Sequence, residues 1–193
     1  MLRRLYDWTM DLAGHRHAGR MLGVVSFIES SVFPIPPDVI LIPMVLSERA
    51  KAWIYATIAT VTSVLGGILG YVIGAFLFDT IGQPLLQFYG YGEKFTDFAA
   101  RYNEWGAWIV FIAGVTPFPY KVITIASGVT ALNPWVFIVA SILARGARFF
   151  VLCALLYWFG PPIRNFVEKY LGLVATAFVV LLIGGFVVVK YAL

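Results

Sequence analysis

The sequence predicts an all-α integral membrane protein. Of its 193 residues, 61% are hydrophobic and 12% are charged, and the mean hydropathy of +0.86 is far above that of a water-soluble domain. Uncharged runs extend over 52–78, 122–144 and 170–189, and each has the roughly 20 residues that a helix needs to cross the hydrocarbon core. Two Pro-x-Pro pairs inside a duplicated motif predict how these segments are arranged.

The duplicated motif relates two segments that lie 83 residues apart. Residues 32–42 read VFPIPPDVILI and residues 115–125 read VTPFPYKVITI. The aligned prolines are Pro34 and Pro36 in the first copy and Pro117 and Pro119 in the second. Asp38 of the first copy falls opposite Lys121 of the second, so the repeat exchanges an acid for a base.

A long apolar segment follows each copy, and a tryptophan opens it. Trp53 in the first repeat and Trp135 in the second are 82 residues apart, so the similarity continues past a gap of one residue. We therefore expect two repeats, over 21–78 and 105–159, in which a hairpin precedes a transmembrane helix.

The prolines interrupt the helices of both copies. Proline lacks a backbone donor, fixes φ and restricts the residue before it, so we expect a break at each of Pro34, Pro36, Pro37, Pro117 and Pro119. Such a break is tolerated at membrane depth only where the backbone faces protein or a water-filled cavity. This predicts two re-entrant hairpins, about 21–47 and 105–130. Because only 52–78 crosses the membrane between them, the hairpins enter from opposite faces and the repeat is inverted.

The remaining segments complete a single membrane domain, 1–193. Residues 1–20 and 79–104 mix aromatic, aliphatic and charged side chains, as interfacial amphipathic helices do. Residues 170–192 are expected to form a C-terminal transmembrane helix. Charges within the first 20 residues interrupt the apolar region of a signal peptide, so no cleaved signal is expected.

Basic residues are distributed unequally between the two faces of this arrangement. The N-terminal face carries eight, namely Arg3, Arg4, Arg16, Arg20, Arg49, Lys51, Arg164 and Lys169, and the other carries Lys94, Arg101 and Lys190. The positive-inside rule therefore predicts a cytoplasmic N-terminus. The bases form no dense run beside stacking aromatics, so a nucleic-acid partner is not expected.

Five ionisable residues lie inside the apolar segments: Glu29, Asp38, Lys121, Arg145 and Arg148. A charge at the centre of a membrane helix costs roughly 2.5–3.5 kcal/mol on insertion scales, so these groups are expected to pair, hydrate or titrate. The two arginines are three residues apart on a helix of about 133–159, which places them on one face.

Guanidinium groups fit phosphate oxygens, so we predict that Arg145, Arg148 and Lys121 bind an anionic headgroup. Glu29 or Asp38 would exchange a proton. The alternative is that the two carboxylates only neutralise the arginines in a buried structural network.

These motifs resemble those of the DedA family, also called the VTT or SNARE-associated domain family, and most closely its small YqaA-like branch. The resemblance covers about 20–160 and rests on residues 29–38 (ESSVFPIPPD), 116–121 (TPFPYK), 126–128 (ASG) and 145–150 (RGARFF). Members are implicated in moving polyprenyl phosphate carriers or phospholipids across membranes, in bacteria often with the proton motive force. The resemblance thus implies a lipid flippase of the bacterial inner membrane whose partners are a lipid and protons, with no cofactor.

By position, Glu29 and Asp38 match the acidic pair of the family's first hairpin, and Lys121 falls near a hairpin arginine. Many members have an Arg-Phe-x-Pro-x-x-Arg pattern there, where this chain reads GVTPFPYK. We expect Arg145 and Arg148 to supply the positive charge that this hairpin lacks.

Two other functions remain open on the sequence. The same hairpins would serve a transporter of small solutes or ions. A lipid phosphatase would need a nucleophile with a base or metal ligands, and the chain offers only His15 and His17 for that role. The spacing of Gly70 and Gly74 permits close helix contact, which we expect within the chain, with a homodimer as the alternative.

Overall fold

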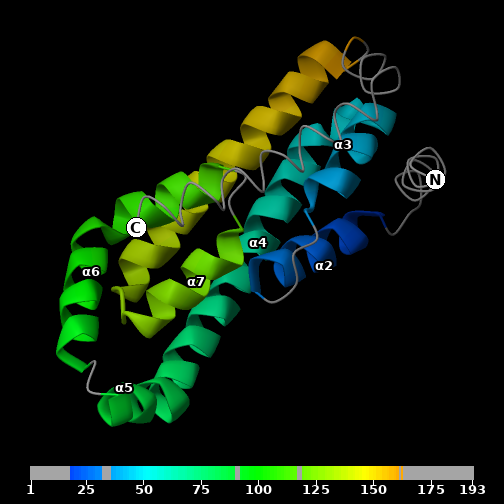
Figure 1. Cartoon of the computed structure of the whole chain (residues 1–193). Coiled ribbons are helices and arrows are strands. Elements are labelled where there is room, and N and C mark those ends of the chain that lie inside the picture. The colour runs from blue at the N-terminus through cyan, green and yellow to red at the C-terminus, as the bar shows by residue number, and fades with distance from the viewer. Residues whose placement is uncertain (1–17, 32–35, 90–91, 117–118, 161, 163–193) are drawn as a thin grey trace.

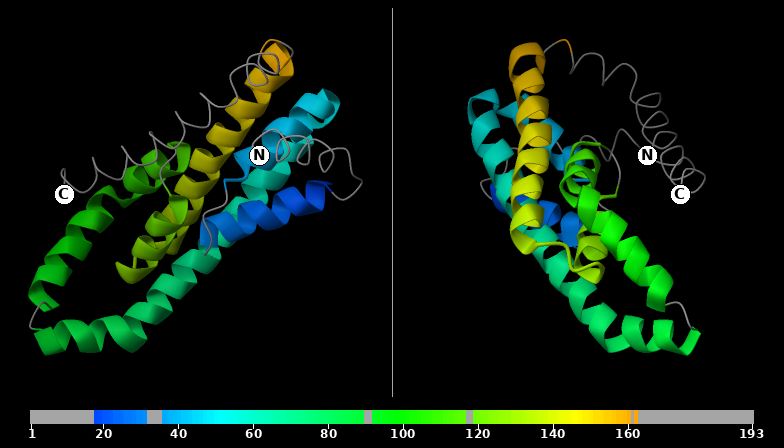
Figure 2. Two further views of the ribbon diagram at one scale, coloured as in Figure 1. Left: turned by 45° about the vertical axis from the view of Figure 1, so that its right-hand side comes forward. Right: turned by 90° about the vertical axis from the view of Figure 1, so that its left-hand side faces the viewer.

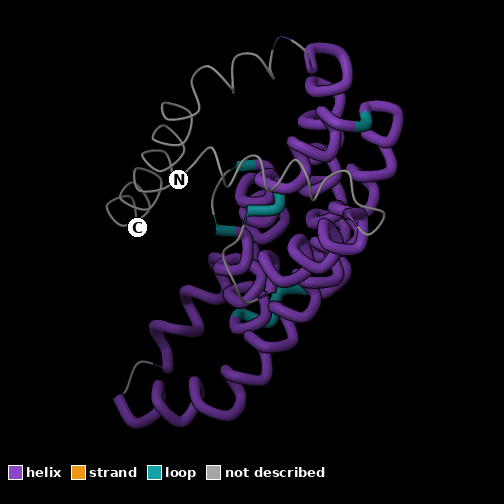
Figure 3. Tube along the Cα trace, turned by 90° about the vertical axis from the view of Figure 1, so that its right-hand side faces the viewer, coloured by secondary structure: helices purple, strands orange, loops and turns teal. Residues whose placement is uncertain are grey.

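The computed structural model describes residues 18–31, 36–89, 92–116, 119–160 and 162, and all regular secondary structure within these ranges is helical (Figure 3). In chain order the elements are α2 (Ala18–Ser31), α3 (Asp38–Ser47), the 3-10 turn η1 (Arg49–Lys51), α4 (Ala52–Leu77), the π-helical turn η2 (Phe78–Gly82), α5 (Gln83–Tyr89), α6 (Gly92–Val115), α7 (Tyr120–Val129) and the helix Pro134–Gly160. The predicted all-α class is confirmed. The histidines, residues 1–17 of the segment predicted at 1–20 and the segment predicted at 170–192 lie outside the described residues, and residues 18–20 belong to α2.

Two helices are long and apolar enough to cross a membrane. The continuous helical stretch Arg49–Gly82, which contains α4, has 34 residues, and Pro134–Gly160 has 27. At about 1.5 Å per residue both exceed the roughly 30 Å of a hydrocarbon core. Only 33% and 39% of their most apolar stretches are buried, so most of that surface is left for a membrane. The two helices run in opposite directions (Figures 1 and 2).

The uncharged run 122–144 is divided between two helices. α7 ends at Val129, and the next helix begins at Pro134. The Asn133 side chain accepts a hydrogen bond from the backbone N–H of Trp135 at 2.9 Å, as an N-cap residue does. The helix predicted at about 133–159 is therefore present, and it carries both arginines.

Both proline-rich segments lie between helices. Pro37 precedes α3 and Pro119 precedes α7, as the repeat predicts, whereas Pro34 and Pro117 lie outside the described residues. α6 continues without interruption to Val115. It therefore joins residues 92–104 of the predicted interfacial segment to the first arm of the second hairpin in one helix, whereas residues 79–89 lie in η2 and α5.

Helix α4 lies in contact with both α2 and α7, and glycines set the closeness of that contact. A Cβ atom on Gly66 would lie 2.1 Å from the carbonyl oxygen of Phe27 in α2. A Cβ atom on Gly74 would lie 2.1 Å from the carbonyl oxygen of Ile125 in α7. The glycines thus pack α4 against helices of its own chain, as expected.

An apolar groove of about 590 Å³ lies between α6 and the helix Pro134–Gly160. Its walls include Trp108 and Phe111 of α6, and Trp135 and Leu143 of the later helix. Arg145 follows Leu143 by two residues, so at 100° per residue it projects from nearly the opposite side of the helix. The groove is therefore not part of the charged site.

Candidate functional site

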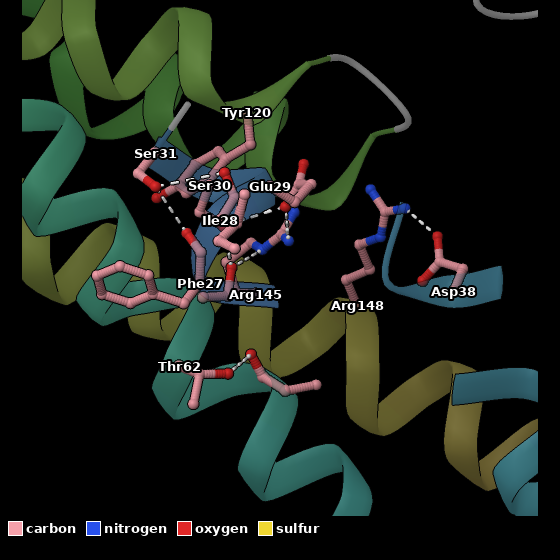
Figure 4. Close-up of polar contacts among 12 residues, drawn as sticks. Phe27, Ile28, Glu29, Ser30, Ser31, Asp38, Thr62, Tyr120, Arg145 and Arg148 are labelled. Carbon is pink, nitrogen blue, oxygen red and sulfur yellow. Dashed lines mark hydrogen bonds and ion pairs between the residues drawn. The ribbon is translucent and has the colours of Figure 1, made fainter. Parts of the chain in front are cut away.

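Arg145 is the centre of the site. Its side chain is 1% exposed, and its Nη2 atom donates to Glu29 Oε2 at 2.7 Å. Its Nε atom donates to Ser63 Oγ at 2.6 Å. One guanidinium therefore joins α2, α4 and the helix Pro134–Gly160, and Glu29 balances its charge (Figure 4).

Two aromatic rings enclose the same guanidinium. Its Cζ atom lies 4.9 Å from the centroid of the Tyr120 ring and 4.8 Å from that of Phe149. Ring faces attract a cation, and the attraction is stronger when water is excluded. The Tyr120 hydroxyl donates to Ser141 Oγ, which fixes the ring. α7 thus becomes a fourth element held around Arg145.

A hydroxyl network extends from Arg145 to the middle of α7. Ser30 Oγ donates to Glu29 Oε2 at 3.0 Å and lies 2.7 Å from Ser63 Oγ. The Thr124 hydroxyl donates to the Ser30 carbonyl oxygen at 3.2 Å, which connects α7 to α2. Each polar group is supplied with a partner from another helix, as burial requires.

Arg148 joins the two proline-broken segments. Its Nη2 atom forms an ion pair with Asp38 Oδ2 at the first residue of α3. Its Nη1 atom donates to the carbonyl oxygen of Thr116 at 2.8 Å, just past the end of α6. These side chains are partly exposed, 17% for Arg148 and 16% for Asp38. Figure 4 shows the two arginines reaching different carboxylates.

Asp38 is paired through one oxygen only. Its Oδ1 atom is buried and has no hydrogen-bond partner among the described residues. A buried carboxylate oxygen without a donor costs free energy, because water satisfied it in the unfolded chain. Glu29 also meets its arginine through one oxygen, Oε2, so the two ion pairs differ in the buried Oδ1 that Asp38 leaves without a partner among the described residues.

The structure brings four of the five predicted residues into direct contact as two ion pairs. Lys121, the fifth, is half-buried in the first turn of α7, next to the Tyr120 that covers Arg145. Its role in binding stays a prediction. The pairing of each carboxylate with one arginine also fits the alternative of a neutralising network.

Ser30, Ser63, Thr116 and Tyr120 were not singled out from the sequence. One signal could have found Ser63. It lies ten residues after Trp53, and Arg145 lies ten residues after Trp135, so equivalent positions of the two repeats touch each other.

Within the described residues, no group of three or more His, Cys, Asp or Glu side chains is placed to hold a metal ion. Cys153, the single cysteine, is buried in the apolar core between α3, α4 and the helix Pro134–Gly160.

Helical structure throughout the described residues, with two apolar helices of spanning length, is typical of a helical membrane protein. The sequence model of the VTT domain matches residues 35–158, so the chain belongs to the VTT-domain family, that is, the DedA family. It is similar to an uncharacterized protein of Haemophilus influenzae, at 36% identity over 186 residues covering 96% of each chain. It is also similar to an uncharacterized protein of Histophilus somni, at 38% identity over 186 residues, covering 96% of this chain and 97% of the relative. No solved structure matches the chain.

Proposed function

We propose that the protein transports an anionic lipid across the bacterial cytoplasmic membrane, with undecaprenyl phosphate or another polyprenyl phosphate, or a phospholipid, as the substrate. The observation that carries the proposal is the pair of arginine–carboxylate contacts where the two proline-broken segments meet a spanning helix. The headgroup would bind to arginine charge at this place while the hydrocarbon tail stays in lipid. No bond is broken, so the protein is proposed not to be an enzyme.

The proposal includes an inverted architecture, in which α2–α3 and α6–α7 are re-entrant hairpins that enter from opposite faces. Two residues related by a two-fold axis can touch only near that axis. The contact between the equivalent positions Ser63 and Arg145 supports such an axis at the centre of the site, and the opposite directions of the two long helices agree with it. Inverted repeats of this kind let a central site open to either side in turn.

Proton coupling is assigned to the carboxylates. A proton on Asp38 or Glu29 would remove the negative charge that competes with a headgroup for the partner arginine. Release of that proton on the other side of the membrane would restore the ion pair and expel the headgroup. The proton motive force could thereby drive the cycle in one direction.

The orientation follows the distribution of basic residues, with the N-terminus proposed to lie in the cytoplasm. A single cysteine placed in the N-terminal segment of a Cys153→Ala variant tests it. Membrane-impermeant maleimide added to intact cells should leave that cysteine unlabelled, and labelling there would reverse the orientation.

The transport proposal is tested with the purified full-length chain in proteoliposomes. Flipping of a fluorescent polyprenyl phosphate and of a fluorescent phospholipid is measured with and without a pH gradient. We expect faster flipping of at least one of them than in protein-free vesicles, and loss of that rate in Arg148→Gln. Equal rates in protein-free and protein-containing vesicles for both lipids would refute the proposal.

The same preparation distinguishes the two other functions. Release of inorganic phosphate from polyprenyl phosphate would indicate a phosphatase. Binding of a phosphorylated headgroup without its chain as tightly as the complete lipid would favour a transporter of small solutes. We expect neither outcome.

A further inference from the structure

The two arginines differ in how completely the protein encloses them. Arg145 is 1% exposed, and the rings of Tyr120 and Phe149 lie on it. Its Nε and Nη2 atoms already donate to Ser63 and Glu29. A headgroup could reach this guanidinium only if buried helix contacts were displaced, which is costly because the groups left behind would lose their partners.

Arg148 lies beside the two proline-rich breaks, whereas Arg145 lies where α2, α4 and the helix Pro134–Gly160 meet. Its two Nη atoms donate to Thr116 and Asp38, which flank the second and the first proline-rich segment. Its side chain is 17% exposed. The pair of Nη donors is the planar fork that binds two oxygens of one phosphate group.

Asp38 accepts from only one of the two Nη atoms, and through only one of its own oxygens. Only Oδ2 is paired, whereas Oδ1 is buried without a hydrogen-bond partner among the described residues. A terminal phosphate has three oxygens, so two can accept from the two Nη atoms while the third accepts from another donor. An anion of this shape could accept from both Nη atoms, where Asp38 accepts from one, and it would take the place of the Thr116 carbonyl oxygen at Nη1.

We propose that Asp38 is an internal competitor for a phosphate group at Arg148, and that Arg145 is a positioning residue which does not touch the substrate. This inference rests on the proposed function and assigns its binding step to one arginine. Without ligand, the Asp38 carboxylate neutralises Arg148. The phosphate displaces it, and the Glu29–Arg145 pair stays intact and holds α2 and α4 against the helix Pro134–Gly160.

The test compares Asp38→Asn with Glu29→Gln. Each variant removes one carboxylate charge that is paired with one arginine and keeps nearly the same shape. Binding to the full-length protein in detergent is measured by calorimetry with farnesyl phosphate, farnesol and inorganic phosphate. Thermal unfolding of each variant is followed in the same buffer.

We expect Asp38→Asn to bind farnesyl phosphate on the order of tenfold more tightly than the wild type, because the competing charge is gone. Arg148→Gln should abolish binding. Glu29→Gln should lower the unfolding temperature without tightening binding. Arg145→Lys, which keeps the charge but loses the paired contacts, should also unfold earlier and keep its affinity within about threefold of the wild type. Binding of inorganic phosphate to the same variants would show that the site recognises the phosphate group alone. Binding of farnesol would show that the site recognises the hydrocarbon tail of the ligand.

Equal tightening by Asp38→Asn and Glu29→Gln would overturn the inference, since a general gain of positive charge would then suffice. Loss of affinity in Arg145→Lys as large as in Arg148→Gln would overturn it as well. If Asp38→Asn does not fold, Asp38→Ser makes the same comparison. Absence of binding by the wild type and by the aspartate variants, together with absence of lipid flipping, would instead refute the proposed function.

Discussion

Replacing Gly66 by alanine tests whether the close contact between α4 and α2 supports the charged site. The new Cβ atom would lie 2.1, 2.8 and 2.9 Å from the carbonyl oxygen, carbonyl carbon and Cα of Phe27. All three are backbone atoms, so no side chain can rotate away. To reach an ordinary contact of 3.4 Å from the oxygen, α2 must move by about 1.3 Å.

That movement would also shift Glu29 away from Arg145, its partner in the buried ion pair. Glu29 and Ser30 follow Phe27 by two and three residues on α2, and they contact Arg145 at 2.7 Å and Ser63 at 2.7 Å. A shift of about 1.3 Å would lengthen these contacts beyond hydrogen-bond range. Overpacking costs about 1–3 kcal/mol, and at roughly 2–4 °C per kcal/mol for a chain of this length the unfolding temperature should fall by about 2–12 °C.

The assay is thermal unfolding of the purified protein in detergent, together with lipid flipping. Gly146→Ala is the matched control. Its Cβ atom would lie 3.8 Å from the Thr60 methyl group, so alanine fits there and gains about 0.5–1 kcal/mol of helix propensity. We expect Gly66→Ala to be less stable than the wild type and slower in flipping, with Gly146→Ala unchanged or slightly stabilised. Equal unfolding temperatures for the two variants would refute the reasoning.

Three further substitutions follow from the contacts of the site. Gly74→Ala would place a Cβ atom 2.1 Å from the carbonyl oxygen of Ile125, so thermal unfolding should show a loss of about 1–3 kcal/mol; wild-type stability would contradict that close approach. Ser63→Ala leaves the buried Nε of Arg145 without an acceptor and should cost about 1–3 kcal/mol in the same assay, whereas the exposed Thr57→Ala should cost much less. Tyr120→Phe keeps the ring over Arg145 but loses the hydroxyl, so we expect about 0.5–1.5 kcal/mol of destabilisation with headgroup affinity retained. Loss of affinity in calorimetry would mean that headgroup binding depends on the hydroxyl and not on the ring.

The sequence predicts the helices well because its breaks have local causes. Pro37 and Pro119 each stand directly before a helix, and the long uncharged stretch after Trp53 can only be a helix in a membrane. The division of 122–144 also has a local signal, Asn133 followed by Pro134, which is typical of a helix start.

The pairing within the site could not be predicted, because it depends on where helices cross. Charges in apolar segments identify Glu29, Asp38, Arg145 and Arg148, but nothing local decides which acid meets which base. Ser63 was missed for a different reason. Hydroxyl groups in membrane helices commonly bond to the backbone one turn earlier, as Thr60, Thr62 and Thr57 do here, so the residue type alone does not indicate that a serine contacts another helix.

The contrast between Arg145 and Arg148 has a simple geometric origin. Three residues along a helix are about 4.5 Å of rise and 300° of rotation, so the two side chains share one side but diverge by about 60°. That divergence directs Arg145 into the crossing with α2 and α4, and directs Arg148 toward the end of α6 and the start of α3.

The proline breaks explain why a guanidinium can be left partly open at that second place. The last carbonyls of a helix have no donor in the next turn, so the Thr116 oxygen is available to Arg148 only because α6 stops there. Asp38 is close because α3 begins directly after the other break. A continuous helix in either repeat would remove one of these two partners. The prolines that interrupt the hairpins therefore create the two contacts that orient the Arg148 side chain. In this way the helix breaks position the arginine that is proposed to bind the headgroup.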